Sequence, residues 1–316
     1  MAQGRHSGTQ IHVPVMSQEV LSSLNISPDG IYLDGTVGLG GHATLILNHL
    51  SPKGHLIGTD RDAEALDHCK QRLSGFPTPV SLFHDSYHNF NAILDGLGID
   101  QVNGFLLDLG LSSLQMDSPE RGFSFAVNAD LDMRFDSSQG VKAADILNQL
   151  PAMELADLIY QYGEERRSRL IARNIEKMRP LKTVFDLIEA IRRSTPPNHR
   201  DRTLARVFQA IRIKVNGELE KLEKFLSSFT KRLVVGGRIA IISFHSLEDR
   251  MVKRFFRNHS RLDPNLSKLP NLRPEHLTDC KIVARRIKPS EKEINSNPRA
   301  RSAVLRVVEK LNETTQ

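Results

Sequence analysis

The chain has 316 residues, of which 39% are hydrophobic and 25% are charged, so it can bury a large core and we expect more than one domain. No apolar run approaches the ~20 residues of a membrane span, and the first ten residues lack the apolar segment of a signal peptide. We therefore expect a cytoplasmic protein with no membrane partner. Cys69 and Cys280 are isolated in the sequence, which predicts two structural thiols and no metal site.

The net charge of +6 is strongly segregated along the chain. Residues 161–215 contain fourteen Lys and Arg against six Asp and Glu, and residues 250–310 contain sixteen against six. These two blocks contribute +8 and +10, so the rest of the chain carries −12. For either block alone, a solvated helix face is the preferred explanation. Two blocks beside a nucleotide-type site favour binding to nucleic acid.

The predicted elements alternate between strands and helices over the first hundred residues. Apolar spacing predicts a first helix over residues 13–24, strands over 31–34, 54–60, 80–84 and 104–109, and intervening helices over 42–50, 63–73 and 87–97. Successive right-handed β-α-β crossovers of this kind predict a parallel sheet with helices on both faces.

The alternation stops near residue 143. The segments LADLIYQYG, RLIARNIEKM and VFDLIEAIRR have helical spacing, with breakers such as STPPN between them, which predicts an inserted helical subdomain. One long helix ending near Leu233 is expected next, then the strand VVGGRIAIISF and an antiparallel pair formed by KIVARRI and SAVLRVVE. We therefore expect a discontinuous domain of residues 1–114 and 216–316. Residues 115–215 would be a site loop plus a helical insertion that recognises the substrate.

The sequence IYLDGTVGLGGHATLIL, residues 31–47, is the most informative for function. It places an apolar strand, an acid, a glycine-rich turn and a helix start in succession, as at the ligand-binding edge of open α/β sheets. The next strand ends in Asp60, 19 residues after Gly41, where an acid can accept hydrogen bonds from two ribose hydroxyls. Asp34 would repel a pyrophosphate but attract the amino group or sulfonium of S-adenosylmethionine. The sequence therefore favours this methyl donor over a nicotinamide dinucleotide, which requires G-x-G-x-x-G.

A third acid, Asp108, lies at the end of the fourth predicted strand, which continues into the loop LGLSSLQMD. Together with ERGFSF, LDMRFD, YGEER, IISFHSLEDR and NPRARSAVLR, this segment closely resembles the bacterial methyltransferases that modify N4 of a cytidine in the decoding region of 16S ribosomal RNA. The resemblance extends from HVPV at His12 to about Val308.

This resemblance implies a Rossmann-like class I methyltransferase, an α/β protein with a mostly parallel seven-stranded sheet and S-adenosylmethionine as cofactor. The implied partner is 16S rRNA in the small ribosomal subunit or its precursor, with no DNA substrate. The implied cofactor contacts are Gly40, Gly41, His42, Asp60, Tyr87, Asp108 and Gln115, which join Asp34 and Gly38 of the glycine-rich turn. The chain departs from the family at Tyr87, where Phe is usual, and at Leu114, where proline is common.

The exocyclic amine of cytosine is a poor nucleophile because its lone pair is delocalised into the ring. The enzyme must therefore hold the amine in line with the methyl donor, against acceptors, and give a proton an exit. DNA amino-methyltransferases use S/D-P-P-Y/F after strand four, whereas this chain has D-L-G-L-S-S at 108–113. A stacking ring must come from elsewhere, and the candidates are Phe123, Phe125 and Phe244.

The candidate base-pocket residues are Asp108, Ser112, Ser243, Phe244 and His245, with Arg134 as a substrate contact. Each of three has a structural alternative: Asp108 as a cap on the following turn, His245 as a buried or helix-capping residue, and Arg134 in a local ion pair. We expect Asp108 and Phe244 to line the same cavity as Gly40, because strand ends four and five are neighbours in such a sheet.

Two other functions are weighed against methyl transfer. A hydrolase built on Ser246, His245 and Asp249 is disfavoured because adjacent Ser and His side chains diverge and no nucleophile-elbow pattern is present. A ribosome-binding assembly factor with little turnover would retain the pocket without using it. The intact acids and glycines of the turn argue against this second alternative.

Overall fold

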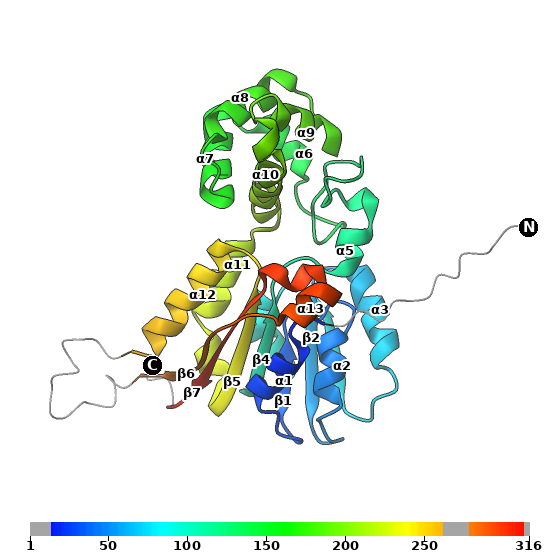
Figure 1. The fold of residues 1–316 in the computed structure, drawn as a ribbon. Coiled ribbons are helices and arrows are strands. Elements are labelled where there is room, and N and C mark those ends of the chain that lie inside the picture. The colour runs from blue at the N-terminus through cyan, green and yellow to red at the C-terminus, as the bar shows by residue number, and fades with distance from the viewer. Residues whose placement is uncertain (1–13, 262–277, 313–316) are drawn as a thin grey trace, which may run out of the picture.

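The computed structural model describes residues 14–261 and 278–312 (Figure 1). Seven strands form one sheet in the order β3-β2-β1-β4-β5-β7-β6. Their bounds are β1 Ile31–Asp34, β2 His55–Asp60, β3 Val80–His84, β4 Val102–Asp108, β5 Leu233–Ser243, β6 Cys280–Ile287 and β7 Val304–Lys310. The pairs from β3 to β5 are parallel, and β7 runs antiparallel to both β5 and β6. The predicted mostly parallel seven-stranded sheet is confirmed.

Helices cover both faces of the sheet because successive side chains along a strand point to opposite faces. One face packs against α1 (Ser17–Leu24), α2 (Gly41–Leu47) and α3 (Ala63–Leu73). The other packs against α4 (Phe90–Gly96), α11 (Glu218–Leu226) and α12 (Ser246–His259). In β4, Leu106 belongs to the first core and Leu107 to the second.

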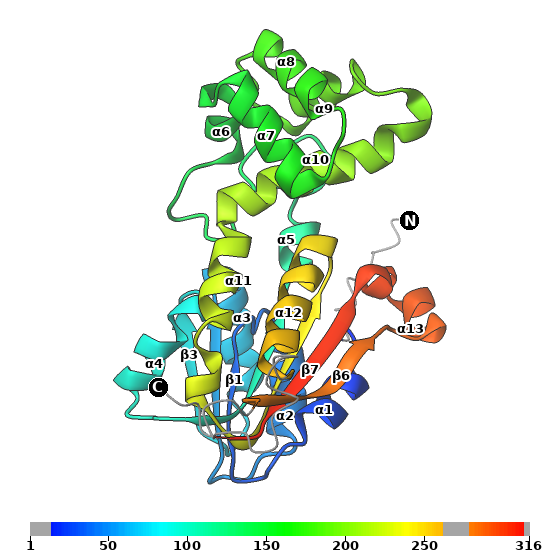
Figure 2. The ribbon, with the colours of Figure 1, turned by 90° about the vertical axis from the view of Figure 1, so that its left-hand side faces the viewer.

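A helical insertion between β4 and β5 stands beyond the end of the sheet at which β4 terminates (Figures 1 and 2). It contains α5 (Ser113–Asp117), α6 (Ala143–Gln149), α7 (Ala152–Gly163), α8 (Ser168–Met178), α9 (Val184–Arg192) and α10 (Arg200–Asn216). Buried residues from Phe123 to Ile211 form a hydrophobic core that is separate from the two cores of the sheet. A further helix, α13 (Glu291–Ser296), lies between β6 and β7. Within the described residues, none of the helices has the length and apolar character needed to cross a lipid bilayer.

Several predicted boundaries differ from the structure. The first helix begins at Ser17 and not at residue 13, because Met16 has a positive φ of 52°. Residues 12 and 13, which open the HVPV motif, lie outside the described residues. The helix expected at 87–97 is a 3-10 turn followed by α4. The prediction of one long helix that ends near Leu233 is wrong. Gly217, at φ +58°, ends α10 in the left-handed conformation and α11 starts in a new direction.

Both cysteines are unpaired and buried, as the sequence predicts. Cys69 belongs to α3 and Cys280 is the first residue of β6. Burial raises the pKa of each thiol to about 12, so neither supplies a thiolate at neutral pH.

Candidate active site

A cavity opens at the carboxyl ends of β1, β2, β4 and β5, beside the point where strand order reverses between β1 and β4. Nine sequence-predicted residues line it: Gly38, Gly41, His42, Asp60, Tyr87, Asp108, Ser112, Gln115 and Phe244. The structure therefore brings Asp108 and Phe244 together in one cavity with the glycine-rich turn. Asp34, Gly40, Ser243, His245 and Arg134 are not among its lining residues.

Asp60 holds the glycine-rich turn in place. Its Oδ2 accepts a hydrogen bond from the Gly38 N–H at 2.8 Å, and its Oδ1 accepts one from the Asp62 N–H at 2.9 Å. Each carboxylate oxygen can accept a second hydrogen bond, so Asp60 retains acceptor capacity on its cavity side. Gly40 has a φ of +80°, and a Cβ there would lie 3.0 Å from the Cys69 sulfur, so this glycine lets the turn pack on α3.

Two buried carboxylate oxygens without hydrogen-bond partners lie beside this turn. The Asp34 side chain is only 1% exposed; its Oδ1 accepts from the Thr36 N–H at 3.1 Å, and its Oδ2 has no partner among the described residues. Burial raises the pKa of Asp34 to about 7; His42 opposes this shift, and the charges of Asp108 and Asp60 add to it. Asp108 Oδ1 is likewise without a partner, and Oδ2 lies 3.5 Å from His42 Nε2. Because unsatisfied buried acceptors are costly, these oxygens indicate a ligand that brings donors and positive charge.

The loop after β4 is capped by Ser112 and not by Asp108. Ser112 Oγ accepts from the Gln115 N–H at 3.2 Å, and Gln115 Oε1 accepts from the Ser112 N–H at 3.1 Å. Gln115 Nε2 also donates to Asp62 at 3.1 Å, which anchors the loop to the segment after β2. The alternative of Asp108 as a turn cap is therefore not observed, and its carboxylate is left facing the cavity.

Of the three candidate stacking rings, Phe244 is the one that lines the cavity. Gly110, at φ +130°, lies beneath it, and a Cβ at Gly110 would come within 3.0 Å of the Phe244 ring. Phe123 is instead buried in the core of the insertion, and Phe125 packs edge-on against Phe208. The two other candidate rings do not line this cavity.

Tyr87 forms part of the cavity wall, with its ring edge-on to Phe225 at 5.8 Å between centroids. Burial raises the pKa of the Tyr87 hydroxyl well above its usual range, and the negative charges of Glu248 and Glu218 add to this effect. The phenol therefore remains protonated at neutral pH and is available as a donor.

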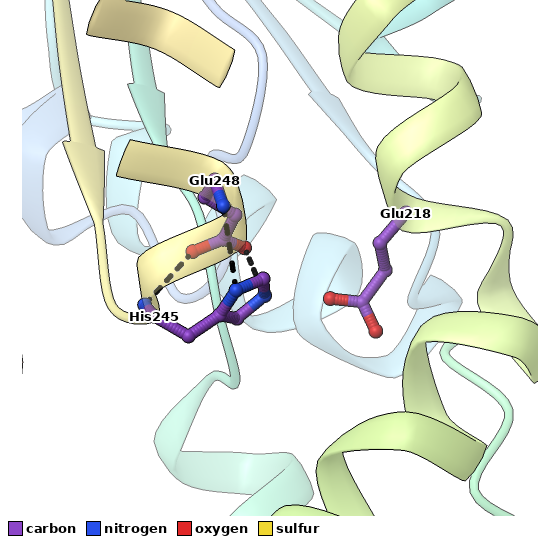
Figure 3. A group of neighbouring side chains, drawn as sticks. All are labelled: Glu218, His245 and Glu248. Atoms are coloured by element: carbon purple, nitrogen blue, oxygen red, sulfur yellow. Dashed lines mark hydrogen bonds and ion pairs between the residues drawn. The ribbon is translucent and has the colours of Figure 1, made fainter. Parts of the chain in front are cut away.

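His245 caps α12, which is the structural role weighed for it from the sequence (Figure 3). Its Nδ1 accepts from the Glu248 N–H at 3.4 Å, and its Nε2 lies 3.2 Å from Glu248 Oε1. Glu248 Oε2 in turn accepts from the backbone N–H groups of Phe244 at 2.9 Å and His245 at 3.3 Å. The pair thus fixes the chain at the end of β5, next to the cavity-lining Phe244.

Glu218 joins these two residues in a group whose ligand atoms lie within 4.8 Å of one another, a size suited to a metal ion (Figure 3). However, Arg212 donates to both Glu218 oxygens, at 2.9 and 2.8 Å. Glu248 is already satisfied by its own helix start. The group is thus neutralised by protein groups and has a structural role.

Two further predicted residues lie away from the cavity. Ser243 is 1% exposed and donates to the Val304 carbonyl oxygen at 3.3 Å, so it joins β5 to β7. Arg134 makes two hydrogen bonds of 2.8 Å to the Asp132 carboxylate and so forms the local ion pair that was the alternative to substrate contact. Its side chain lines a second cavity.

The structure also adds wall residues that sequence reasoning missed. Glu218, Lys221 and Leu222 come from α11, on the far side of the helical insertion, and no motif marks them. Arg61 directly follows Asp60, and its guanidinium lies 5.3 Å from the centre of the Phe135 ring. For these wall residues, the only indication in the sequence was that Arg61 directly follows Asp60, the acid at the end of β2.

A doubly wound sheet with a glycine-rich turn at its switch point and acids at three neighbouring strand ends defines a Rossmann-like class I methyltransferase. Sequence comparison is more specific: the chain belongs to the MraW methylase family, whose profile matches residues 9–311. It is 47% identical over 307 residues to ribosomal RNA small subunit methyltransferase H of Syntrophotalea carbinolica, covering 95% of this chain and 98% of the relative.

The protein of the same name from Thermosipho africanus is 45% identical over 304 residues, with 95% and 98% covered. Among solved structures, an rRNA methylase from Streptococcus thermophilus is 14% identical with a TM-score of 0.43, covering 94% of this chain and 95% of the other.

Proposed function

We propose that this protein transfers a methyl group from S-adenosylmethionine to the N4 amine of a cytidine in the decoding region of 16S rRNA, within the small ribosomal subunit or its precursor in the cytoplasm. The observation that carries the proposal is the pair of unsatisfied carboxylate oxygens, Asp34 Oδ2 and Asp108 Oδ1, beside the glycine-rich turn. The name shared by the relatives supports ribosomal RNA as the substrate. The cytidine and its position rest on the resemblance of the motifs in residues 104–117 and 241–250.

The residues present fit S-adenosylmethionine. Its sulfonium supplies an activated methyl group, and together with the ammonium it brings the positive charge that the three strand-end acids lack. Asp34 directly precedes the lining residues Gly35 and Thr36, and its Oδ2 would accept from the ammonium. Asp60 would accept from the ribose hydroxyls with the lone pairs that Gly38 and Asp62 leave free. The flat Tyr87 ring would lie at the adenine end of the cavity.

The base would enter between Phe244 and the loop after β4. Stacking on Phe244 would hold the cytosine plane, since this ring lies over Gly110 and the Phe244 backbone N–H donates to Glu248. Asp108 Oδ1 has no other partner and would accept a hydrogen of the amine, which favours a pyramidal nitrogen with an available lone pair. The proton released would leave through this carboxylate.

Residues 115–215 would form the substrate-recognition subdomain. Residues 161–215 carry a net charge of +8, and the exposed Arg192 and Arg193 lie at the end of α9. Cationic side chains on a lobe above the cavity suit an RNA backbone. Ser112, Arg134, Ser243 and His245 would support the base pocket through the contacts that they make within the protein.

A methyl-transfer assay tests the function. Small subunits from cells that lack the enzyme should accept a radiolabelled methyl group from S-adenosylmethionine, close to one per subunit. Subunits from cells that contain it should accept none, because their site is already methylated. Tight binding to the unmethylated subunits without incorporation of label would instead identify an assembly factor.

A further inference from the structure

A second cavity, with a volume of about 350 Å³, lies beside the candidate active site. It is formed by the chain after β2 and β3, by the junction of α10 and α11, and by the loop of residues 134–140. Arg61, Ser86 and Lys221 line both cavities. A group bound against these three residues would therefore be a direct neighbour of whatever occupies the active site.

Arg61 and Lys221 are partly buried cations without a carboxylate partner. Among residues 14–261 and 278–312, neither has an acidic oxygen within 4.0 Å. Both donate instead to one carbonyl oxygen, that of Asn216; the Arg61 Nη1 distance is 3.0 Å. Burial and, after it, the charge of Arg61 lower the pKa of Lys221 to about 8, against the opposing charges of Glu218 and Glu220. Two cations on one carbonyl leave positive charge that an anion would neutralise.

Neutral groups in the same cavity also lack partners. Ser86 is 6% exposed, and its Oγ has no hydrogen-bond partner among the described residues. His88 Nδ1 is likewise buried without a partner. Burial lowers the pKa of His88 to about 4, and Lys224 and Lys221 add to this shift, so the ring is neutral at physiological pH. A buried hydroxyl beside two cations is a typical donor set for a phosphate oxygen.

The acids in the second cavity are already used by their own loops. Asp136 accepts three hydrogen bonds from Ser138 and Gln139, at 2.9, 2.6 and 2.6 Å. Asp85 Oδ1 accepts from the Ser86 N–H at 2.6 Å and from Asn89 at 2.7 Å. Arg134 is neutralised by Asp132. The cations that remain for a ligand are those in the wall shared with the active site.

We propose that Arg61, Lys221 and Ser86 form a phosphate subsite that holds the phosphodiester next to the target nucleotide of the RNA. The inference rests on the proposed function, because it assigns a place to the backbone of that substrate. The cofactor does not account for the subsite, since S-adenosylmethionine contains no phosphate and its carboxylate belongs to the methionine end. A phosphate held in this wall would tether the nucleotide whose base enters the adjacent cavity.

The test is binding to unmethylated small subunits across a salt series, with S-adenosylhomocysteine present so that no turnover occurs. The variants are Arg61→Gln, Lys221→Gln and Ser86→Ala, with Lys231→Gln as the control because Lys231 is exposed and lines neither cavity. The two charge-removing variants should bind about tenfold more weakly or worse, with a salt slope shallower by about 0.7. Ser86→Ala should weaken binding without changing the slope, and Lys231→Gln should bind like the wild type.

Cofactor affinity, measured by calorimetry, decides between the two cavities. Lys221→Gln should keep the wild-type affinity for S-adenosylmethionine. If the variants lose cofactor affinity and keep subunit affinity, these groups belong to the cofactor site and the inference is overturned. The inference is also overturned if the wild-type protein binds inorganic phosphate at matched ionic strength while the three variants bind subunits with wild-type affinity. The site would then take a free anion and not the RNA backbone. A wild type that binds subunits but methylates nothing would instead refute the proposed function alone.

Discussion

Replacing Asp34 with Asn should remove a pH dependence from cofactor binding. In the free protein, burial holds the pKa of this carboxyl at about 7, and its Oδ2 has no partner. A cofactor ammonium at this oxygen requires the ionised form, so binding should lower the pKa and release a proton. Affinity for S-adenosylmethionine should therefore rise with pH through about 7 in the wild type and stay level in Asp34→Asn.

The magnitude follows from the fraction of Asp34 that is ionised. With a pKa of about 7 in the free protein, the competent fraction changes about 25-fold between pH 5.5 and pH 7.5, and the apparent Kd should change by the same factor. This range ends below the pH at which the amino group of the ligand loses its proton, about 7.7 to 8.0. At pH 7.5, the variant should bind roughly ten- to hundredfold more weakly than the wild type, because a charged hydrogen bond is lost.

The stability of the free protein should fall as pH rises, whereas its affinity for the cofactor should increase. Because the folded-state pKa of Asp34 is raised, this group stabilises the free protein at low pH, and that contribution is lost as pH rises from about 4 to about 7. Without cofactor, Asp34→Asn should therefore gain in Tm relative to the wild type as the pH increases from 5 to 7.5. The difference in unfolding free energy should reach up to a few kcal/mol.

Calorimetry in buffers of different ionisation enthalpy measures both the affinity and the number of protons released. His42→Gln is the matched control, because the charge of His42 also acts on Asp34. The dependence should persist in His42→Gln and disappear in Asp34→Asn. A wild-type Kd that is constant from pH 5.5 to 7.5, or a dependence that follows His42, would refute the assignment of Asp34.

Asp60→Ala should bind S-adenosylmethionine about ten- to hundredfold more weakly, since it loses a charged acceptor and the Gly38 tether; unchanged affinity by calorimetry in a folded variant would exclude Asp60 from the cofactor site. Reversing Arg192 and Arg193 to Glu should weaken subunit binding and flatten its salt dependence at unchanged cofactor affinity; if neither changes, the α9 end is an ordinary solvated surface. Phe244→Leu should cost about 1–3 kcal/mol of base stacking and raise the KM for subunits, whereas Phe244→Tyr should restore it; a wild-type KM in Phe244→Leu would exclude stacking on this ring.

The centre of the sheet was predictable from sequence because β1, β2, β4 and β5 are largely buried and therefore read as short apolar runs. β1, β3 and α3 have the predicted bounds, and the acids at the ends of β1, β2 and β4 follow from position alone. The break at Gly217 was not predictable, because a glycine inside a helical pattern is also compatible with a continuous helix. This break redirects the chain so that α11 forms a wall of the site.

The wall residues missed from sequence are those supplied by long-range packing. Lys221 reaches the cavity only because the insertion returns the chain beside β4, which no local spacing encodes. His245 shows the converse limit. A histidine at a strand end suits a functional role, but the structure uses His245 to cap α12.

The position of the transferred methyl on the base tests the central claim most directly. Nucleoside mass spectrometry with chromatographic standards, on small subunits methylated in vitro, should locate the methyl on N4 of one decoding-region cytidine. Methylation at carbon 5 normally requires a cysteine nucleophile, and neither Cys69 nor Cys280 lines the cavity. A methyl found on carbon 5, or on a cytidine outside the decoding region, would contradict the account.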